Sequence, residues 1–166
     1  MSNDSVDVSK TFGNKLRVRV CGLHIRKNKI LLIKHKGLGK DNVFWAPPGG
    51  GVEFGETLEK ALQREMLEEC NGKYRIDEFL FHYEFVKPPL HALEYFFKVS
   101  PVNHSQKISI GKDPELDNQQ QIIEKVAWLS EEEVKTIHPD SKHGIFSIAD
   151  RFSELMKLKG LFSSKK

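Results

Sequence analysis

The chain has 166 residues, of which 39% are hydrophobic and 30% charged, and its formal net charge is +3 at pH 7. This length and composition predict one soluble domain with its own core. The small net charge argues against nucleic acid as a partner, the lack of a long apolar run argues against a membrane span, and the polar N-terminus argues against a secretion signal. Two cysteines, Cys21 and Cys70, are too few for a disulfide framework, so we expect free thiols and a cytoplasmic location.

The N-terminal third is predicted to be mostly extended after a flexible leader at residues 1–16. A first strand is predicted at residues 17–25, where apolar and polar side chains alternate. Residues 27–29 are typical of a turn, and the continuous apolar run at 30–33 predicts a strand covered on both faces. A polar loop follows at residues 37–42.

A helix of about four turns is predicted at residues 57–71. Thr57 is a suitable N-cap, and Asn71 suits the left-handed turn that ends a helix. The glycines at 49–51, just upstream, allow the backbone to approach a ligand closely, although a tight turn would need them as well.

This helix carries acids on the face that should meet the core. Its apolar stripe consists of Leu58, Ala61 and Leu62. At about 100° per residue, Glu65 and Glu69 fall on the same stripe one turn apart, and Glu68 lies at its edge. Like charges at this spacing cost a helix roughly 0.2–0.5 kcal/mol per pair, and burial raises that cost. A divalent cation would relieve the repulsion, and hard oxygen ligands suit Mg²⁺.

The second half of the chain predicts a hairpin, a long loop and two more helices. Residues 74–87 and 91–99 are predicted to pair as antiparallel strands, with a core-facing aromatic row that comprises Phe79, Phe81, Tyr83 and Phe85. The polar connection at 100–121 is long enough to be functional. A strand is predicted at 122–129.

The C-terminal part begins with a short helix that Ser130 caps. A closing helix is predicted at residues 143–158, with an apolar face of Ile145, Ile148, Phe152, Leu155 and Met156. Residues 160–166 are predicted to be a flexible tail. Strands that flank a central helix, with a second helix at the end, indicate a mixed sheet between helices.

The central helix is part of a longer pattern. It runs from Gly50 through five residues to Glu56, and then through seven more to the sequence Arg64-Glu65-Met66-Leu67-Glu68-Glu69. This resembles the Nudix box, G-x5-E-x7-R-E-U-x-E-E-x-G-U, in which U is a bulky apolar residue. Every charged position matches, whereas Asn71 and Gly72 replace the last glycine and the last apolar residue. Neither replacement removes a metal ligand.

The resemblance to the Nudix (MutT-like) hydrolases implies an α/β/α sandwich with a mixed β-sheet, as one domain over residues 17–159. It implies Mg²⁺- or Mn²⁺-dependent hydrolysis of the pyrophosphate bond in a nucleoside diphosphate linked to another group, with release of a nucleoside phosphate. The partner would be a small nucleotide, handled by a monomer or homodimer. A non-catalytic nucleotide-sensing domain and an RNA cap hydrolase remain alternatives; the particular substrate cannot be read from the box.

The resemblance also assigns roles within the box. The implied metal ligands are the carbonyl of Gly49 and the side chains of Glu65, Glu68 and Glu69. Arg64 is implied to hold the catalytic glutamate by hydrogen bonding, and Glu56 to support the same framework. The general base would be Glu65 or Glu69, or, from outside the box, Glu115 or Glu124.

Four further residues are candidates for substrate binding. Phe44 and Trp45 directly precede the proline-glycine loop and are placed to stack on a nucleobase, although a place in the core suits Trp45 equally. Arg17 and Arg19 lie on one side of the first strand, towards phosphate or towards water. The seven histidines show no spacing that predicts a metal site.

Overall fold

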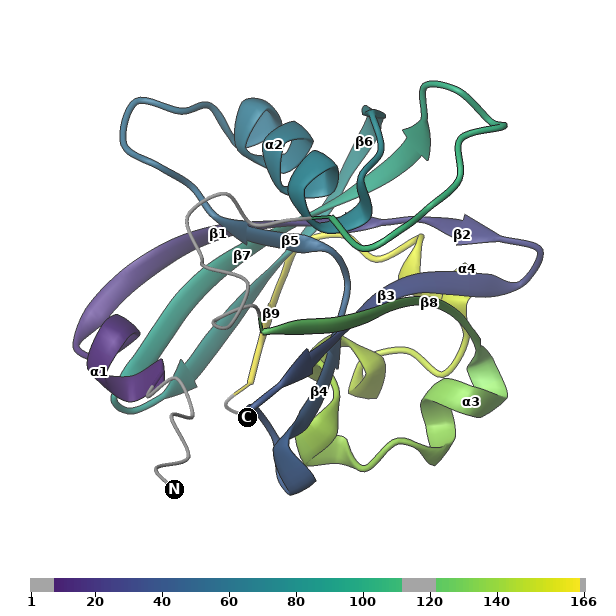
Figure 1. Cartoon of the computed structure of the whole chain (residues 1–166). Helices are drawn as coiled ribbons and strands as arrows, with labels where there is room; N and C mark the ends of the chain where they lie inside the picture. Colours follow the sequence, from purple (N-terminus) through teal and green to yellow (C-terminus); the bar gives the residue numbers. More distant parts are fainter. Residues whose placement is uncertain (1–7, 112–121, 165–166) are drawn as a thin grey trace, which may run out of the picture.

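The computed structural model describes residues 8–111 and 122–164. Its strands have one long helix, α2 (Leu58–Cys70), on one side and shorter helical elements on the other (Figure 1). The strands form two sheets rather than one. A five-stranded sheet has the order β5-β1-β7-β6-β9, and a second sheet contains β2, β3, β4 and β8. The fold is of the mixed α/β class that the sequence predicts.

The five-stranded sheet is mixed. Its strands are β5 (Gly49–Gly51), β1 (Lys15–Leu23), β7 (Leu90–Pro101), β6 (Tyr74–Lys87) and β9 (Leu161–Ser163). The β6 and β7 strands pair antiparallel, which confirms the predicted hairpin. By contrast, β1 pairs parallel with β7 and antiparallel with β5. The glycine loop is therefore tied, as an edge strand, to the first strand of the chain.

The second sheet is built around β3. Its strands are β2 (Ile25–Arg26), β3 (Lys29–Lys36), β4 (Val43–Ala46) and β8 (Ile123–Ser130). The β8 strand pairs along most of β3, while β2 and β4 pair with opposite ends of its other edge. Leu31 and Ile33 are fully buried on one face of β3 and Ile30 and Leu32 on the other, as expected of a strand that is covered on both faces.

The helix α2 (Leu58–Cys70) lies over one face of the sheets (Figure 1). Thr57 Oγ1 accepts the backbone N–H of Lys60, and Asn71 ends the helix in the left-handed conformation, so both predicted ends are confirmed. The buried side chains of α2 pack into one core cluster, which includes Val20, Leu31, Ile33, Ala61, Leu62, Met66, Phe97 and Val99. This packing fixes the height of α2 above β5 and β1.

The other face is covered by shorter elements: α3 (Glu131–Thr136), α4 (Phe152–Leu155) and the 3₁₀ turns η2 (Pro139–Ser141) and η3 (Gly144–Ser147). The capping box at Ser130 is present and begins α3 as predicted. The second core cluster lies beneath these elements and includes Leu23, Ile30, Leu32, Phe81, Phe96, Ile145, Phe152 and Leu155. Two further short elements are α1 (Val8–Phe12) and the turn η1 (Lys40–Asn42).

The predicted closing helix at residues 143–158 is wrong. The segment forms η3 and then, after a break, the single turn α4. The N–H of Ile145 donates to His143 Nδ1, which caps η3, whereas the N–H of Phe152 donates to the carboxylate of the distant Glu131 at 2.8 Å, so the two turns start separately. Ile145 and Phe152 are still buried, because they fill the core from two separate turns.

The ends of the domain also differ from the expectation. Residues 161–163, placed in a flexible tail, form β9, which pairs parallel with β6. At the other end, residues 8–12 of the expected leader form α1, and its last two residues are the first of β1; residues 1–7 lie outside the described part of the chain. Pairing with a neighbouring strand can thus form a strand in a short segment whose own sequence pattern does not predict one.

The aromatic row of β6 is interrupted. Register shifts in the pairing with β7 lie between Ile76 and Glu78 and between Phe79 and Phe81. Because a bulge changes the face that later residues occupy, Phe79 is 41% exposed whereas Phe81 is fully buried. The prediction that Phe79 shares a face with Phe81 is therefore wrong.

Within the described residues no helix has the length and apolarity that crossing a membrane requires. Cys21 and Cys70 are buried free thiols, as expected.

Candidate functional site

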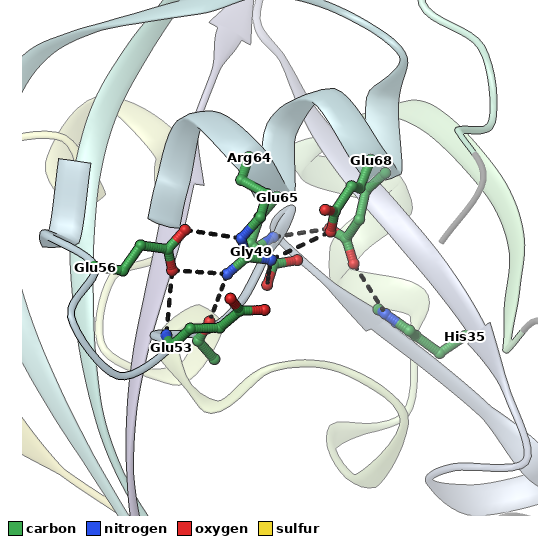
Figure 2. A network of polar contacts seen from close by, with 9 residues as sticks. His35, Gly49, Glu53, Glu56, Arg64, Glu65 and Glu68 are labelled. Carbon is green, nitrogen blue, oxygen red and sulfur yellow. Dashed lines mark hydrogen bonds and ion pairs between the residues drawn. The ribbon is translucent and has the colours of Figure 1, made fainter. Parts of the chain in front are cut away.

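The acids of α2 lie directly against the glycine strand β5 (Figure 2). The closest approach is at Gly50: a Cβ atom there would lie 2.2 Å from Glu65 Oε1. Only glycine leaves room for the carboxylate at this position. The glycine loop and the acidic helix of the sequence pattern therefore form one structural unit.

Arg64 is at the centre of this unit (Figure 2). Its Nε and Nη2 donate to the two carboxylate oxygens of Glu56 at 2.9 and 3.0 Å. Its Nη1 donates to Glu65 at 3.0 Å and to Glu68 at 3.2 Å, and its Nη2 also donates to the carbonyl of Gly51 at 3.0 Å. One guanidinium thus holds three carboxylates and the loop backbone.

Glu69 is the most deeply placed acid of the group. Its residue exposure is 8%, and its Oε2 accepts the backbone N–H of Gly49 at 2.8 Å. The structure therefore joins Glu69 to Gly49, while Glu65 and Glu68 meet at Arg64; the metal-ligand role of these four residues stays a prediction. Glu53 adds a contact that the sequence did not indicate, because its backbone N–H donates to Glu56 at 3.1 Å.

Burial and mutual repulsion shape the charges of this site. Burial, and then the nearby charge of Glu69, raise the pKa of Glu65 to about 7, although Arg64 acts in the opposite direction. The hydrogen bonds from Arg64 lower the pKa of Glu56 and raise that of Arg64 itself. Glu56 and Arg64 consequently remain a charged pair at neutral pH, while Glu65 is close to the point at which it accepts a proton.

His35 joins this group from β3, although no sequence pattern singled it out. Its Nε2 lies 3.9 Å from Glu69 Oε1, the contact drawn as a dashed line from His35 in Figure 2. Its Nδ1 lies 3.3 Å from the carbonyl oxygen of Phe44. The pairing of β3 with β4 sets His35 opposite Phe44. The only sequence signal was its position two residues after the buried Ile33, on the same face of the strand.

The predicted substrate arginines lie on the face of β1 that points away from α2. Arg19 donates to Glu94 at 3.0 Å, and Glu94 in turn contacts His143 Nε2 at 2.8 Å. Glu94 and His143 are buried polar residues that the sequence did not indicate. The Arg17 guanidinium lies 3.8 Å from the ring centre of Phe12. Burial and the neighbouring charge of Arg19 lower the pKa of Arg17 to about 10.

The structure places the two aromatic candidates, Phe44 and Trp45, in different surroundings. Trp45 packs against the core cluster beneath α4, so the core alternative holds for this side chain. Its carbonyl accepts the N–H of His143 at 2.9 Å. Phe44 is partly exposed on the neighbouring position of β4, next to His35.

The two outside candidates for the general base have different outcomes. Glu115 lies outside the described residues. Glu124 accepts a hydrogen bond from Lys34 at 2.9 Å. This contact lies at the irregularity in the β3–β8 pairing between Lys34 and His35, and the role of Glu124 as a base stays a prediction.

The donor set fits a hard divalent cation. Carboxylate and carbonyl oxygens are the ligands that Mg²⁺ and Mn²⁺ prefer. Over residues 8–111 and 122–164, no three His, Cys, Asp or Glu side chains converge into a ready-made metal cage, and Arg64 is hydrogen-bonded to two of the acids. Mg²⁺ usually takes only one or two carboxylates and completes its shell with water and substrate phosphates, which is compatible with these residues.

Comparisons with known proteins agree with this geometry. The NUDIX domain model matches residues 15–147. An ADP-ribose pyrophosphatase of Methanocaldococcus jannaschii is 52% identical over 52 residues, which are 31% of this chain and 30% of that protein. The curated match thus spans less than a third of either chain.

Solved structures extend the likeness to the whole fold. A NUDIX hydrolase from Nitrosomonas europaea has a TM-score of 0.66 and 22% identity, covering 87% of this chain and 93% of that chain. A MutT NUDIX hydrolase from Burkholderia pseudomallei has a TM-score of 0.60 and 21% identity, covering 82% and 96%. Because the family model spans most of the chain, box included, this protein belongs to the NUDIX family, the Nudix (MutT-like) hydrolases.

Proposed function

We propose that this chain is a divalent-metal-dependent pyrophosphohydrolase that cleaves nucleoside diphosphates linked to another group. The observation that carries the proposal is the contact set of Arg64, which gathers Glu56, Glu65 and Glu68 against the carbonyl of Gly51. Catalysis requires that the reacting groups are held in line, and a framework with several contacts to each side chain can do this.

The metal would be Mg²⁺ or Mn²⁺, held by Glu65, Glu68, Glu69 and the carbonyl of Gly49. The chemistry that such an ion supplies is neutralisation of phosphate oxygens and acidification of an attacking water. Glu65 or Glu69 would take the proton from that water as general base. Arg64 keeps Glu65 in place through the 3.0 Å hydrogen bond, so it positions the acid and does not itself react.

The substrate would be a small nucleotide, with ADP-ribose as the first compound to test because the curated relative from Methanocaldococcus jannaschii is an ADP-ribose pyrophosphatase. Arg17 remains the candidate phosphate contact: its Nη2 borders β5, 3.6 Å from a Cβ on Gly51, and although it lies on the other face of β1 the charge of Glu65 still acts on its pKa. Arg19 is held by Glu94, so it would act mainly through that framework. Phe44 remains the candidate for stacking. The buried free thiols support a cytoplasmic location, and the chain would act there as a monomer or homodimer.

The test is a substrate panel in ¹⁸O-labelled water with Mg²⁺ or Mn²⁺. It contains ADP-ribose, sugar nucleotides, nucleoside triphosphates, dinucleoside polyphosphates and capped RNA, with Glu69→Gln as the inactive control. We expect label on a phosphate product and release of a nucleoside monophosphate, because the oxygen-rich site is suited to attack on phosphorus. Label on a sugar carbon, release of free base, or no turnover of any compound would overturn the proposal, and turnover of capped RNA alone would favour the cap hydrolase.

A further inference from the structure

His35 lies in a fixed orientation beside the acids. It pairs with Phe44 across the β3–β4 ladder, and its Nδ1 lies 3.3 Å from the Phe44 carbonyl oxygen. A carbonyl oxygen only accepts hydrogen bonds, so Nδ1 carries the hydrogen. In the neutral imidazole, Nε2 then has its lone pair exposed. Histidines that ligate metals in proteins usually have this tautomer anchored by a backbone carbonyl or a carboxylate.

The lone pair of Nε2 faces Glu69. The distance from Nε2 to Glu69 Oε1 is 3.9 Å, and the two side chains are only 14% and 11% exposed. This distance is too long for a hydrogen bond. The other oxygen of Glu69 is held by the Gly49 N–H at 2.8 Å, which leaves Oε1 directed at the imidazole. Two acceptor atoms that face each other in a sheltered site repel each other, and a cation between them or a proton on the imidazole would relieve that repulsion.

We propose that His35 Nε2 is a nitrogen ligand of the divalent ion, together with Glu69, and that it makes this site favour transition metals such as Mn²⁺ or Co²⁺ over Mg²⁺. An ion bonded to both atoms at roughly 2.1 Å would hold them no more than about 4.2 Å apart. The observed 3.9 Å therefore allows one ion to contact both atoms. Imidazole suits transition metals, whereas Mg²⁺ prefers oxygen alone. The inference rests on the proposed function for the presence of an ion.

The competing reading is a protonated His35 that forms a direct ion pair with Glu69. The two readings differ in what the ion contacts: a ligand nitrogen is bonded to the metal, whereas an ion pair leaves the metal with oxygen ligands only. Nitrogen bonded to Mn²⁺ is detected by its magnetic coupling to the metal electrons. Identifying the atoms bonded to the ion therefore distinguishes the two readings without any measurement of hydrolysis.

The experiment is pulsed electron paramagnetic resonance on the full chain loaded with Mn²⁺. Wild-type protein with natural ¹⁴N and protein with ¹⁵N-labelled histidine are compared, together with His35→Gln. The matched control is His91→Gln, because His91 Nε2 also lies beside a carboxylate, 3.1 Å from Glu84 Oε1, at the hairpin end of β7. Circular dichroism and melting establish that each variant is folded.

We expect a ¹⁴N coupling in wild type and in His91→Gln, its replacement by a ¹⁵N coupling in the labelled protein, and its loss in His35→Gln. The Mn²⁺ dissociation constant should rise at least about tenfold in His35→Gln, with a smaller change for Mg²⁺, by analogy with the loss of outer-shell partners. Absence of histidine coupling in wild type, or its persistence in His35→Gln, would overturn the inference. If the inference fails but wild type hydrolyses a substrate, the proposed function still stands. If Mn²⁺ binds through His35 but no substrate is hydrolysed, the result counts against the proposed function alone.

Discussion

Glu69 Oε2 accepts the backbone N–H of Gly49 at 2.8 Å, so the most buried acid of α2 is hydrogen-bonded to the first residue of β5. This contact orients one carboxylate oxygen towards the loop and leaves the other directed at His35. Through it, the geometry of the acids depends on the pairing of β5 with β1.

Replacement of a box acid by its amide should separate catalysis from folding. In Glu65→Gln and in Glu69→Gln we expect the fold to persist and the hydrolysis rate to fall at least about a hundredfold, the lower scale for loss of a general base. The metal-free variants should be as stable as wild type or slightly more stable, because a repelling charge is removed. Steady-state rates and urea unfolding measure both, with the exposed Glu59→Gln on the same helix as the control. Near-normal rates in both variants would contradict the assigned roles.

Gly50→Ala should disturb the site through a single methyl group. The added Cβ would lie 2.2 Å from Glu65 Oε1, so the carboxylate has to move. A displacement of about 1 Å can cost about a hundredfold in rate, and we expect a loss of this order in kcat with little unfolding. Gly51→Ala is the matched control, because its Cβ would meet only Arg17 Nη2 at 3.6 Å, an ordinary contact. Equal rates for the two variants would show that Glu65 does not need its present position.

Divalent metal should raise the melting temperature. An ion that binds only the folded state stabilises it by mass action, by about 2.7 kcal/mol at a hundred times its dissociation constant, and it also relieves the repulsion between Glu65 and Glu69. Thermal melts with millimolar Mg²⁺ or Mn²⁺ against EDTA measure the shift. The shift should shrink in Glu69→Gln and remain in Glu59→Gln. No shift in wild type with either ion would argue against a metal site.

The buried Glu94 should make stability depend on acid pH. Burial opposes its charged form, but the charge and hydrogen bond of His143, and then those of Arg19, outweigh it and lower the pKa to about 2. The other titratable groups that interact with Glu94 are Arg17, Cys21 and Tyr83. Because the folded pKa is below the ordinary value of 4.5, the stabilisation is present above pH 4.5 and is lost as the pH falls from 4.5 towards 2.

Unfolding free energies from urea titrations between pH 7 and pH 2 check this expectation. Glu94→Gln should lose about 3–5 kcal/mol at pH 7, because Arg19 is left without its buried partner, and its loss between pH 4.5 and 2 should be smaller. Asp77→Asn, which removes an exposed partner of Arg75, should cost about 0–1 kcal/mol. If the plot of unfolding free energy against pH has the same shape in wild type and in Glu94→Gln, Glu94 is not the group responsible for the pH dependence.

Local sequence pattern was sufficient to predict the elements that are stabilised mainly by residues close in the chain. The ends of α2 followed from Thr57 and Asn71, because a cap and a left-handed stop act within one turn. The box spacing brought Gly50, Arg64 and Glu65 together correctly, because strand, loop and helix are adjacent in the chain. The hairpin of β6 and β7 was predictable for the same reason.

Tertiary structure decided what depends on distant segments. The strand β9 exists because β6 offers an edge to it, and the predicted C-terminal helix is broken because Glu131 caps the turn at Phe152 from another element. Neither partner is visible in local periodicity. Register shifts in β6 likewise reassigned Phe79, since a single bulge reverses the faces of a strand.

The amino-acid sequence by itself determined the family, the acidic helix and the residues that Arg64 gathers, because these lie within one stretch of 23 residues between Gly50 and Gly72. Only the tertiary structure placed His35 beside Glu69 and joined Arg19 to Glu94 and His143. Those contacts link residues from separate strands and turns, and their geometry follows from strand register and core packing, which no local spacing specifies.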